Sequence, residues 1–333
     1  MTPGSPAPQR GSLCPPCSLA FLLGFCAVLA GPPLAASEIA AGVELIPGSF
    51  VAGTQPDGNT VVLRGADGLV VVDTGRHREH TQRVVDFART AGDAVRFVVN
   101  THWHLDHVGG NPVLRAEFPQ ARVLSSDAIE GALTGFLARY RAQLEDMLAR
   151  AASPDAAAPL RAELAILDAA PALVPDEVVA ASGRRTLAGR VLDVHLETGA
   201  VTAGDLWLVD VESRTLIAGD LVTLPAPFFD TACPQRWSAA LGRLGAVEFT
   251  TLVPGHGPPM DRAQLARYRT AFDALLACAA SDRAKEACVD GWLGDAGPLI
   301  AEGDRELAGS LIGYYLDTTL SAPAEQLAER CRS

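Results

Sequence analysis

The chain has 333 residues, of which 48% are hydrophobic, enough for a sizeable buried core in one large domain or two ordinary ones. This composition excludes wholesale disorder. The formal net charge of −12 argues against nucleic acid and against an anionic membrane as partners, because both would repel the chain.

Residues 1–36 have the pattern of a secretory signal peptide. Arg10 is the one basic residue before an apolar run at 19–30, and the small residues that follow place cleavage near Ala36. The run is shorter than the roughly 20 residues that a membrane-spanning helix needs. We therefore expect a periplasmic or secreted protein with no stable membrane insertion after cleavage. An uncleaved N-terminal anchor is the alternative.

Cleavage would remove three of the seven cysteines and leave Cys233, Cys278, Cys288 and Cys331. Four cysteines in an oxidising compartment allow three pairings, among which the sequence alone does not decide. The short separation of Cys278 and Cys288 favours a disulfide between adjacent helical segments. Cys233 would then pair with Cys331.

Short β-branched runs and stretches with helical periodicity alternate along the rest of the chain. They predict strands at 43–46, 60–64, 69–72, 95–99, 190–196, 205–209 and 215–217. They predict helices at about 80–91, 126–150 and 156–170. Asp261 and Gln264 form a capping-box signature for a further helix. Strands interleaved with helices indicate a layered α/β fold.

Three imidazoles and one carboxylate stand within six positions, directly after the strand predicted at 95–99. They are His102, His104, Asp106 and His107. A turn after the strand lets several of them converge on a cation, and nitrogen and oxygen ligands of this kind suit Zn²⁺ and related transition metals. A solvated histidine-rich loop is the alternative interpretation.

This run resembles the HxHxDH signature of the metallo-β-lactamase-fold hydrolases. Three further motifs of the family are matched in order: an Asp-Thr-Gly run that begins at Asp73, an Ala-Gly-Asp run that ends at Asp220, and a Pro-Gly-His run that ends at His256. The resemblance covers about residues 43–260. It implies a four-layer αββα sandwich over residues 37–270, with a helical insertion at about 126–180 and a helical C-terminal extension over 271–333.

The resemblance also implies six metal ligands: His102, His104, Asp106, His107, Asp220 and His256. The first two would hold one ion, the others would hold a second, and Asp220 would bridge both. Asp73 would orient a ligating histidine rather than bind metal. The expected cofactor is zinc, as one or two ions, or another divalent transition metal.

A third family motif departs from the pattern. Family members supply a further histidine from a Gly-His-Thr-x-Gly-Asp element, and the counterpart at 199–205 places Val201 at the position of that histidine. Valine has no lone pair, so the first metal position is one protein ligand short and the second should bind more tightly. His77, His80 and His195 are candidates for a substitute ligand; a surface or hydrogen-bonded role is the alternative for each.

Two chemical possibilities stay open. In the first, a single zinc at the intact position lowers the pKa of a water to about 7, and His102 or His104 acts as a general base or polarises the substrate. In the second, two metals bind, and water or substrate completes the first position. The catalytic candidates are therefore Asp106, His102 and His104.

The family acts on β-lactams, thioesters, lactones, phosphodiesters and sulfate esters, so the resemblance does not select a substrate. Export argues against nucleic-acid processing. Phe228, Phe229 and Trp103 are expected at the mouth of the site, which favours a small-molecule ester, lactone or amide, although the two phenylalanines could equally belong to the core. A non-catalytic metal-binding or interaction protein on the same scaffold is the alternative function.

Overall fold

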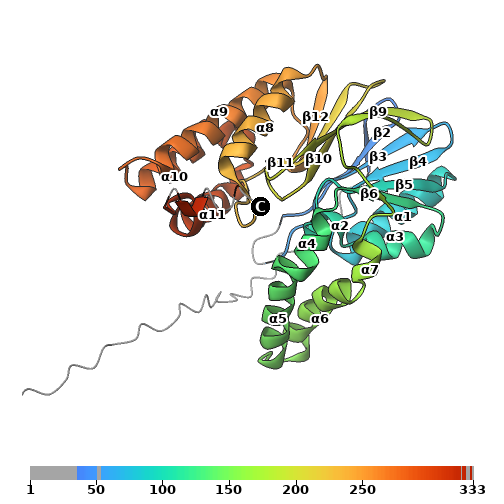
Figure 1. Ribbon diagram of the computed structural model, residues 1–333, viewed down its shortest axis with the longest axis horizontal. Helices are drawn as coiled ribbons and strands as arrows, with labels where there is room; N and C mark the ends of the chain where they lie inside the picture. The colour runs from blue at the N-terminus through green and yellow to red at the C-terminus, as the bar shows by residue number, and fades with distance from the viewer. Residues whose placement is uncertain (1–35, 51–53, 324, 328–330, 332–333) are drawn as a thin grey trace, which may run out of the picture. The chain divides into compact units, whose positions relative to one another are not determined.

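The computed structural model describes residues 36–50, 54–323, 325–327 and 331 (Figure 1). The predicted signal peptide therefore lies outside the described residues, apart from Ala36. Among the helices that are described, none is long and apolar enough to cross a membrane.

The described strands form two sheets. The first sheet has the order β1 (Ser37–Ala40), β2 (Val43–Ile46), β3 (Thr60–Gly65), β4 (Gly68–Val72), β5 (Val95–Val99), β6 (Arg122–Ser125) and β7 (Glu177–Val178). The second has the order β12 (Thr251–His256), β11 (Thr215–Thr223), β10 (Asp205–Asp210), β9 (Arg190–Glu197) and β8 (Gly183–Leu187). Pairing is antiparallel from β1 to β4 and parallel from β4 to β7, so the first sheet is mixed.

Side-chain alternation along the strands explains how the layers form. In β3, Val61 and Leu63 pack in the cluster that lies between the two sheets, together with Leu206 and Leu208 of β10. The intervening Val62 packs on the opposite face with the helices α1 (Arg78–Ala91) and α3 (Asn111–Glu117). Because successive side chains of a strand point to opposite faces, an unbroken apolar run lets a strand bury both of its faces.

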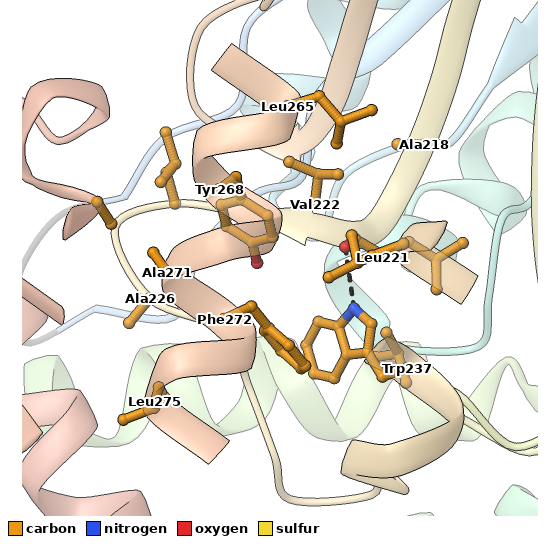
Figure 2. Close-up of a cluster of buried hydrophobic side chains, with 14 of the residues drawn as sticks. Ala218, Leu221, Val222, Ala226, Trp237, Leu265, Tyr268, Ala271, Phe272 and Leu275 are labelled. Atoms are coloured by element: carbon orange, nitrogen blue, oxygen red, sulfur yellow. Dashed lines mark hydrogen bonds between the residues drawn. The ribbon is translucent and has the colours of Figure 1, made fainter. Parts of the chain in front are cut away.

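Helices α8 (Pro234–Ala246) and α9 (Arg262–Ala279) cover the outer face of the second sheet. Figure 2 shows their aromatic side chains in this cluster, where the indole Nε1 of Trp237 donates a 2.9 Å hydrogen bond to the carbonyl of Leu221. The predicted capping box at the start of α9 is confirmed, with reciprocal bonds between Asp261 and Gln264. Helices outside both sheets give the four-layer αββα sandwich that the resemblance implied.

Helices α4 (Ala128–Thr134), α5 (Phe136–Ala149), α6 (Pro154–Asp168) and α7 (Ala170–Leu173) follow β6 and precede β7. The prediction of one continuous helix over 126–150 is wrong, because the backbone of Gly135 leaves the helical region with φ −106 and ψ −99. Apolar side chains of these helices, among them Leu137 and Leu167, pack on Trp103 and Leu105. The insertion therefore rests on the segment that carries the histidine motif.

The chain ends in α10 (Lys285–Asp295), the 3₁₀ turns η1 (Gly297–Leu299) and η2 (Glu302–Asp304), α11 (Arg305–Tyr315) and the π-helical turn η3 (Leu316–Leu320). These elements share one hydrophobic cluster with α8 and α9. Disulfides join Cys233 to Cys331 and Cys278 to Cys288, so the pairing favoured by the sequence is confirmed. The first of them links the end of the described chain to the start of α8.

Candidate metal centre

The six side chains predicted as metal ligands come together at the carboxyl ends of strands from both sheets. His102 and His104 follow β5, and the short helix α2 (Leu105–Val108) carries Asp106 and His107. Asp220 lies within β11 and His256 ends β12. The pairing of β11 with β12 shifts register on either side of Gly219, whose φ is +53. The irregularity therefore lies directly before Asp220, at the point where β11 brings this side chain into the site.

Two ligand sets share one carboxylate. One potential ligand atom from each of Asp106, His107, Asp220 and His256 lies within 4.8 Å of the others. The same limit holds for His102, His104 and Asp220. The shared carboxylate therefore stands between a group of four and a group of three.

Short nitrogen-to-oxygen distances define the group of four. The Nε2 atom of His107 lies 3.1 Å from Oδ1 of Asp220, and Nε2 of His256 lies 3.0 Å from Oδ2 of Asp106. In the group of three, Nε2 of His102 lies 3.7 Å from the other oxygen of Asp220. All three imidazole nitrogens therefore face carboxylate oxygens across gaps of about 3–4 Å, which is the arrangement of ligands around a cation.

Five buried atoms of this site lack a hydrogen-bond partner within the described part of the chain. They are Nε2 of His102, His107 and His256 and both carboxylate oxygens of Asp220. A buried polar atom without a partner costs about 1–3 kcal/mol, so such atoms are rare in native proteins. Since all five belong to side chains that the sequence predicts as metal ligands, the donor set fits a divalent cation.

Asp73 holds the ring of His107 from behind. Its Oδ2 atom lies 2.8 Å from Nδ1 of His107 and also accepts a bond from the hydroxyl of Thr101, while its Oδ1 atom accepts a bond from the backbone N–H of Thr101. The carboxylate therefore accepts the Nδ1 proton, so in the neutral ring the lone pair of His107 is on Nε2, which faces Asp220. Asp73 adopts a φ of +61, uncommon for a residue with a side chain, at the point where the chain leaves β4.

The charges of the site stabilise one positive charge among the carboxylates. Burial alone would lower the pKa of His107, but the carboxylates of Asp220 and Asp73 outweigh it and raise this pKa well above its usual value. Burial, together with the neighbouring ring of His107, lowers the pKa of His102 well below the ordinary value. Burial also lowers the pKa of His104. The carboxylates thus favour a positive charge on His107 in the group of four, whereas His102 and His104 of the group of three are neutral imidazoles.

Two glycines leave room for these side chains. A Cβ atom at Gly255 would lie 2.0 Å from Oδ1 of Asp220, and a Cβ atom at Gly58 would lie 2.5 Å from the ring of His107. Any larger residue at either position would displace the side chain of Asp220 or of His107.

The candidate substitute histidines have other partners. His77 places Nδ1 2.9 Å from Oδ2 of Asp57, and His80 places Nε2 2.8 Å from the hydroxyl of Thr60. His195 stacks on Trp207 with a ring separation of 3.7 Å. None of the three belongs to the ligand groups found among the described residues.

Sequence reasoning missed a buried cation beside Asp106. Arg76 follows the Asp-Thr-Gly run, and its guanidinium lies 3.6 Å from Oδ1 of Asp106 and 2.8 Å from Oε2 of Glu163 on α6. The hydroxyl of Tyr140 on α5 donates to the same oxygen of Glu163. The helical insertion thereby reaches Asp106, a candidate metal ligand, through the side chains of Glu163 and Arg76, although nothing in local spacing signals the contact.

The expected aromatic mouth needs a correction. Phe229 is fully buried in the cluster of α8 and α9, because its ring packs on Trp237, so it lines no opening. Phe228 is partly buried and sets its ring edge-on to His256 at 5.8 Å. Phe50 stacks on Phe228 and also contacts His256. Apolar surface beside the site therefore comes from Phe50 and Phe228.

The comparisons with known proteins agree with the motifs and the architecture. A sequence model of the metallo-beta-lactamase superfamily matches residues 53–277, more than half of the chain, and the protein belongs to that superfamily. A linear primary-alkylsulfatase from Pseudomonas sp. (strain ATCC 19151) is 26% identical over 225 residues, which are 60% of this chain and 41% of that protein. The match thus spans about two fifths of the curated relative.

Solved structures match the fold. A metallo-beta-lactamase from Pontibacter korlensis aligns with a TM-score of 0.53 and 23% identity, over 72% of this chain and 98% of that one. A metallo beta lactamase from Hirschia baltica aligns with a TM-score of 0.52 and 17% identity, over 72% and 98%. At these identities the likeness establishes the fold.

Proposed function

We propose that the protein is a zinc-dependent hydrolase that cleaves an ester, lactone, amide or related bond of a small molecule. Membership in the superfamily supports a metal-dependent hydrolase. The observation that carries the proposal is the set of five buried atoms on His102, His107, His256 and Asp220 that have no hydrogen-bond partner among the described residues. Nitrogen and carboxylate oxygen ligands in this number suit zinc.

A bound divalent metal supplies Lewis acidity, which brings the pKa of a water toward 7 and polarises the bond that is cut. The chain's own residues prepare the site for it. Asp73 fixes the ring of His107, and Arg76 is placed to keep Asp106 ionised. Burial raises the pKa of Asp106, but His107 and His256 outweigh it and lower this pKa well below the ordinary value. We infer that all six side chains predicted as ligands take part in metal binding.

We infer further that the two metal positions are unequal. Four side chains serve the second position, whereas His102, His104 and the shared Asp220 serve the first. Val201 is fully buried. Its carbonyl accepts a hydrogen bond from the hydroxyl of Thr231, which also contacts His104. This connection to His104 supports the alignment that sets Val201 in place of the missing histidine. Either one metal binds at the second position, or a second, weaker ion also binds at the first.

Sulfate esters form a second candidate substrate class, because the curated relative is an alkylsulfatase. Export to an oxidising compartment, periplasmic or extracellular, is also proposed, and the two disulfides are compatible with it.

The test is hydrolysis of a panel of chromogenic β-lactam, lactone, carboxylic ester, amide and sulfate ester substrates. Each is assayed with zinc-loaded protein, with chelator-treated protein and with the Asp220→Ala variant, whose folding is checked by circular dichroism. We expect turnover of at least one class that chelation abolishes and zinc restores. Absence of turnover across the panel, together with weak zinc binding, would favour the non-catalytic metal-binding or interaction protein.

A further inference from the structure

Thr231 stands at the first metal position, in the loop between β11 and α8. Its Oγ1 atom lies 2.9 Å from the carbonyl oxygen of Val201 and 2.9 Å from Nε2 of His104. A hydroxyl has one proton, and a carbonyl oxygen can only accept. The Thr231 hydroxyl therefore donates to Val201 and accepts from the N–H at Nε2 of His104.

This bond decides which nitrogen of His104 can bind a metal. A neutral imidazole carries one proton, and a metal binds the nitrogen without it. With the proton on Nε2, the lone pair of His104 is on Nδ1. The ring of His102 lies 4.5 Å away, centroid to centroid, so both imidazoles belong to the same corner of the site.

We propose that Thr231 is a positioning residue for the first metal position, because its hydroxyl holds His104 as the Nε2–H tautomer and so leaves the lone pair on Nδ1 available to an ion. This inference rests on the proposed metal-dependent function. Val201, which takes the place of the family's histidine, acts through its main-chain carbonyl, which orients the hydroxyl of Thr231. The position that lost a ligand thus keeps a defined imidazole donor.

The C-terminal helices and the Val201 loop hold Thr231 in place. The backbone N–H of Cys233 donates to the carbonyl of Ala200, and Cys233 is bonded to Cys331. The hydroxyl of Tyr315 on α11 donates a 2.6 Å bond to Oδ2 of Asp230, directly before Thr231. Hydrogen bonds and a disulfide therefore fix the loop on both sides of Thr231, at Asp230 and at Cys233, as a positioning residue requires.

The experiment compares Thr231→Val, which removes the hydroxyl at nearly constant shape, with Thr231→Ser, which keeps it. In ¹⁵N-histidine NMR of chelator-treated protein, we expect the Nε2–H tautomer of His104 in the natural protein and in T231S, and a smaller population of this tautomer in T231V. In zinc titrations against a chromophoric chelator, T231V should weaken the first-position affinity by about 10–100-fold, the usual effect of losing the partner of a ligating histidine. T231S should restore it, and the second position should be unchanged in both variants.

An unchanged His104 tautomer in T231V overturns the inference whatever the metal does. Equal loss of affinity at both positions, or an equal loss in T231S, would also overturn it, since either result indicates a general disturbance of the loop. If the natural protein binds no zinc at all, the proposed function fails, and the NMR comparison still decides the role of Thr231.

Discussion

The ion pair between the helical insertion and the metal-site loop gives a prediction about stability. Glu163 lies 2.8 Å from the guanidinium of Arg76, and each side chain is only 9% exposed. The change Glu163→Ala would leave the buried cation without its closest carboxylate. Breaking a buried pair in this way costs about 3–5 kcal/mol. Because Asp106 lies 3.6 Å from the same guanidinium and compensates in part, we expect a loss near the lower end, about 3 kcal/mol.

The assay is urea unfolding of chelator-treated protein, since bound metal would add its own stabilisation. The midpoint should fall at a nearly constant slope. Asp168→Ala is the matched control, because it removes a carboxylate from the same helix, α6, whose ion pair to Arg141 on α5 is more accessible to solvent, with side chains 67% and 34% exposed; this change should cost less than about 1 kcal/mol. A loss for Glu163→Ala no larger than that of the control would refute the reasoning.

Three further predictions concern other parts of the chain. Burial raises the pKa of Asp57, but the bond from the His77 ring outweighs it and lowers this pKa from 3.8 to about 2. Asp57→Asn should therefore cost about 2 kcal/mol at pH 7, and the deficit should shrink as the pH falls from about 4 to 2 and the natural carboxylate is protonated; a deficit independent of pH in urea unfolding would contradict this. Cys331→Ser, which opens a disulfide spanning 98 residues, should destabilise by up to about 4.7 kcal/mol, and Cys288→Ser, with a span of 10, by up to about 2.7 kcal/mol in the chain-entropy picture; the reverse order of unfolding midpoints would count against it. Val201→His should raise zinc affinity at the first position, because it supplies the third protein nitrogen that the position lacks, and unchanged stoichiometry and affinity in a zinc titration would dismiss the alignment of the third motif.

Local sequence patterns were sufficient to predict many of the strands and helices. Runs rich in β-branched residues predict strands such as β2 and β5, and the four-residue capping box predicts the start of α9. Helical periodicity continued across Gly135, so the break between α4 and α5 was invisible without its backbone angles. Strand β8, with two arginines in five residues, has too little apolar patterning to be recognised.

In the site, too, local spacing predicts some residues, whereas other contacts depend on the tertiary fold. Four of the six candidate ligands stand within six positions, so their convergence needs only one turn after β5. Thr231 contacts His104 at a sequence separation of 127 residues, and Glu163 contacts Arg76 at a separation of 87 residues. No rule based on local spacing predicts contacts between residues so far apart in the sequence. The apolar character of Phe229 was equally compatible with a core and with a mouth, and packing against Trp237 decided for the core.

The central claim is that six side chains form two unequal metal positions that share Asp220. A zinc titration of chelator-treated protein, followed by competition with a chromophoric chelator and by elemental analysis, tests it most directly, with His256→Ala and His102→Ala beside the natural chain. We predict that the tighter affinity is lost in His256→Ala, that His102→Ala keeps it, and that any second, weaker equivalent is lost in His102→Ala. Full zinc binding by His256→Ala, or two equal affinities in the natural protein, would contradict the account.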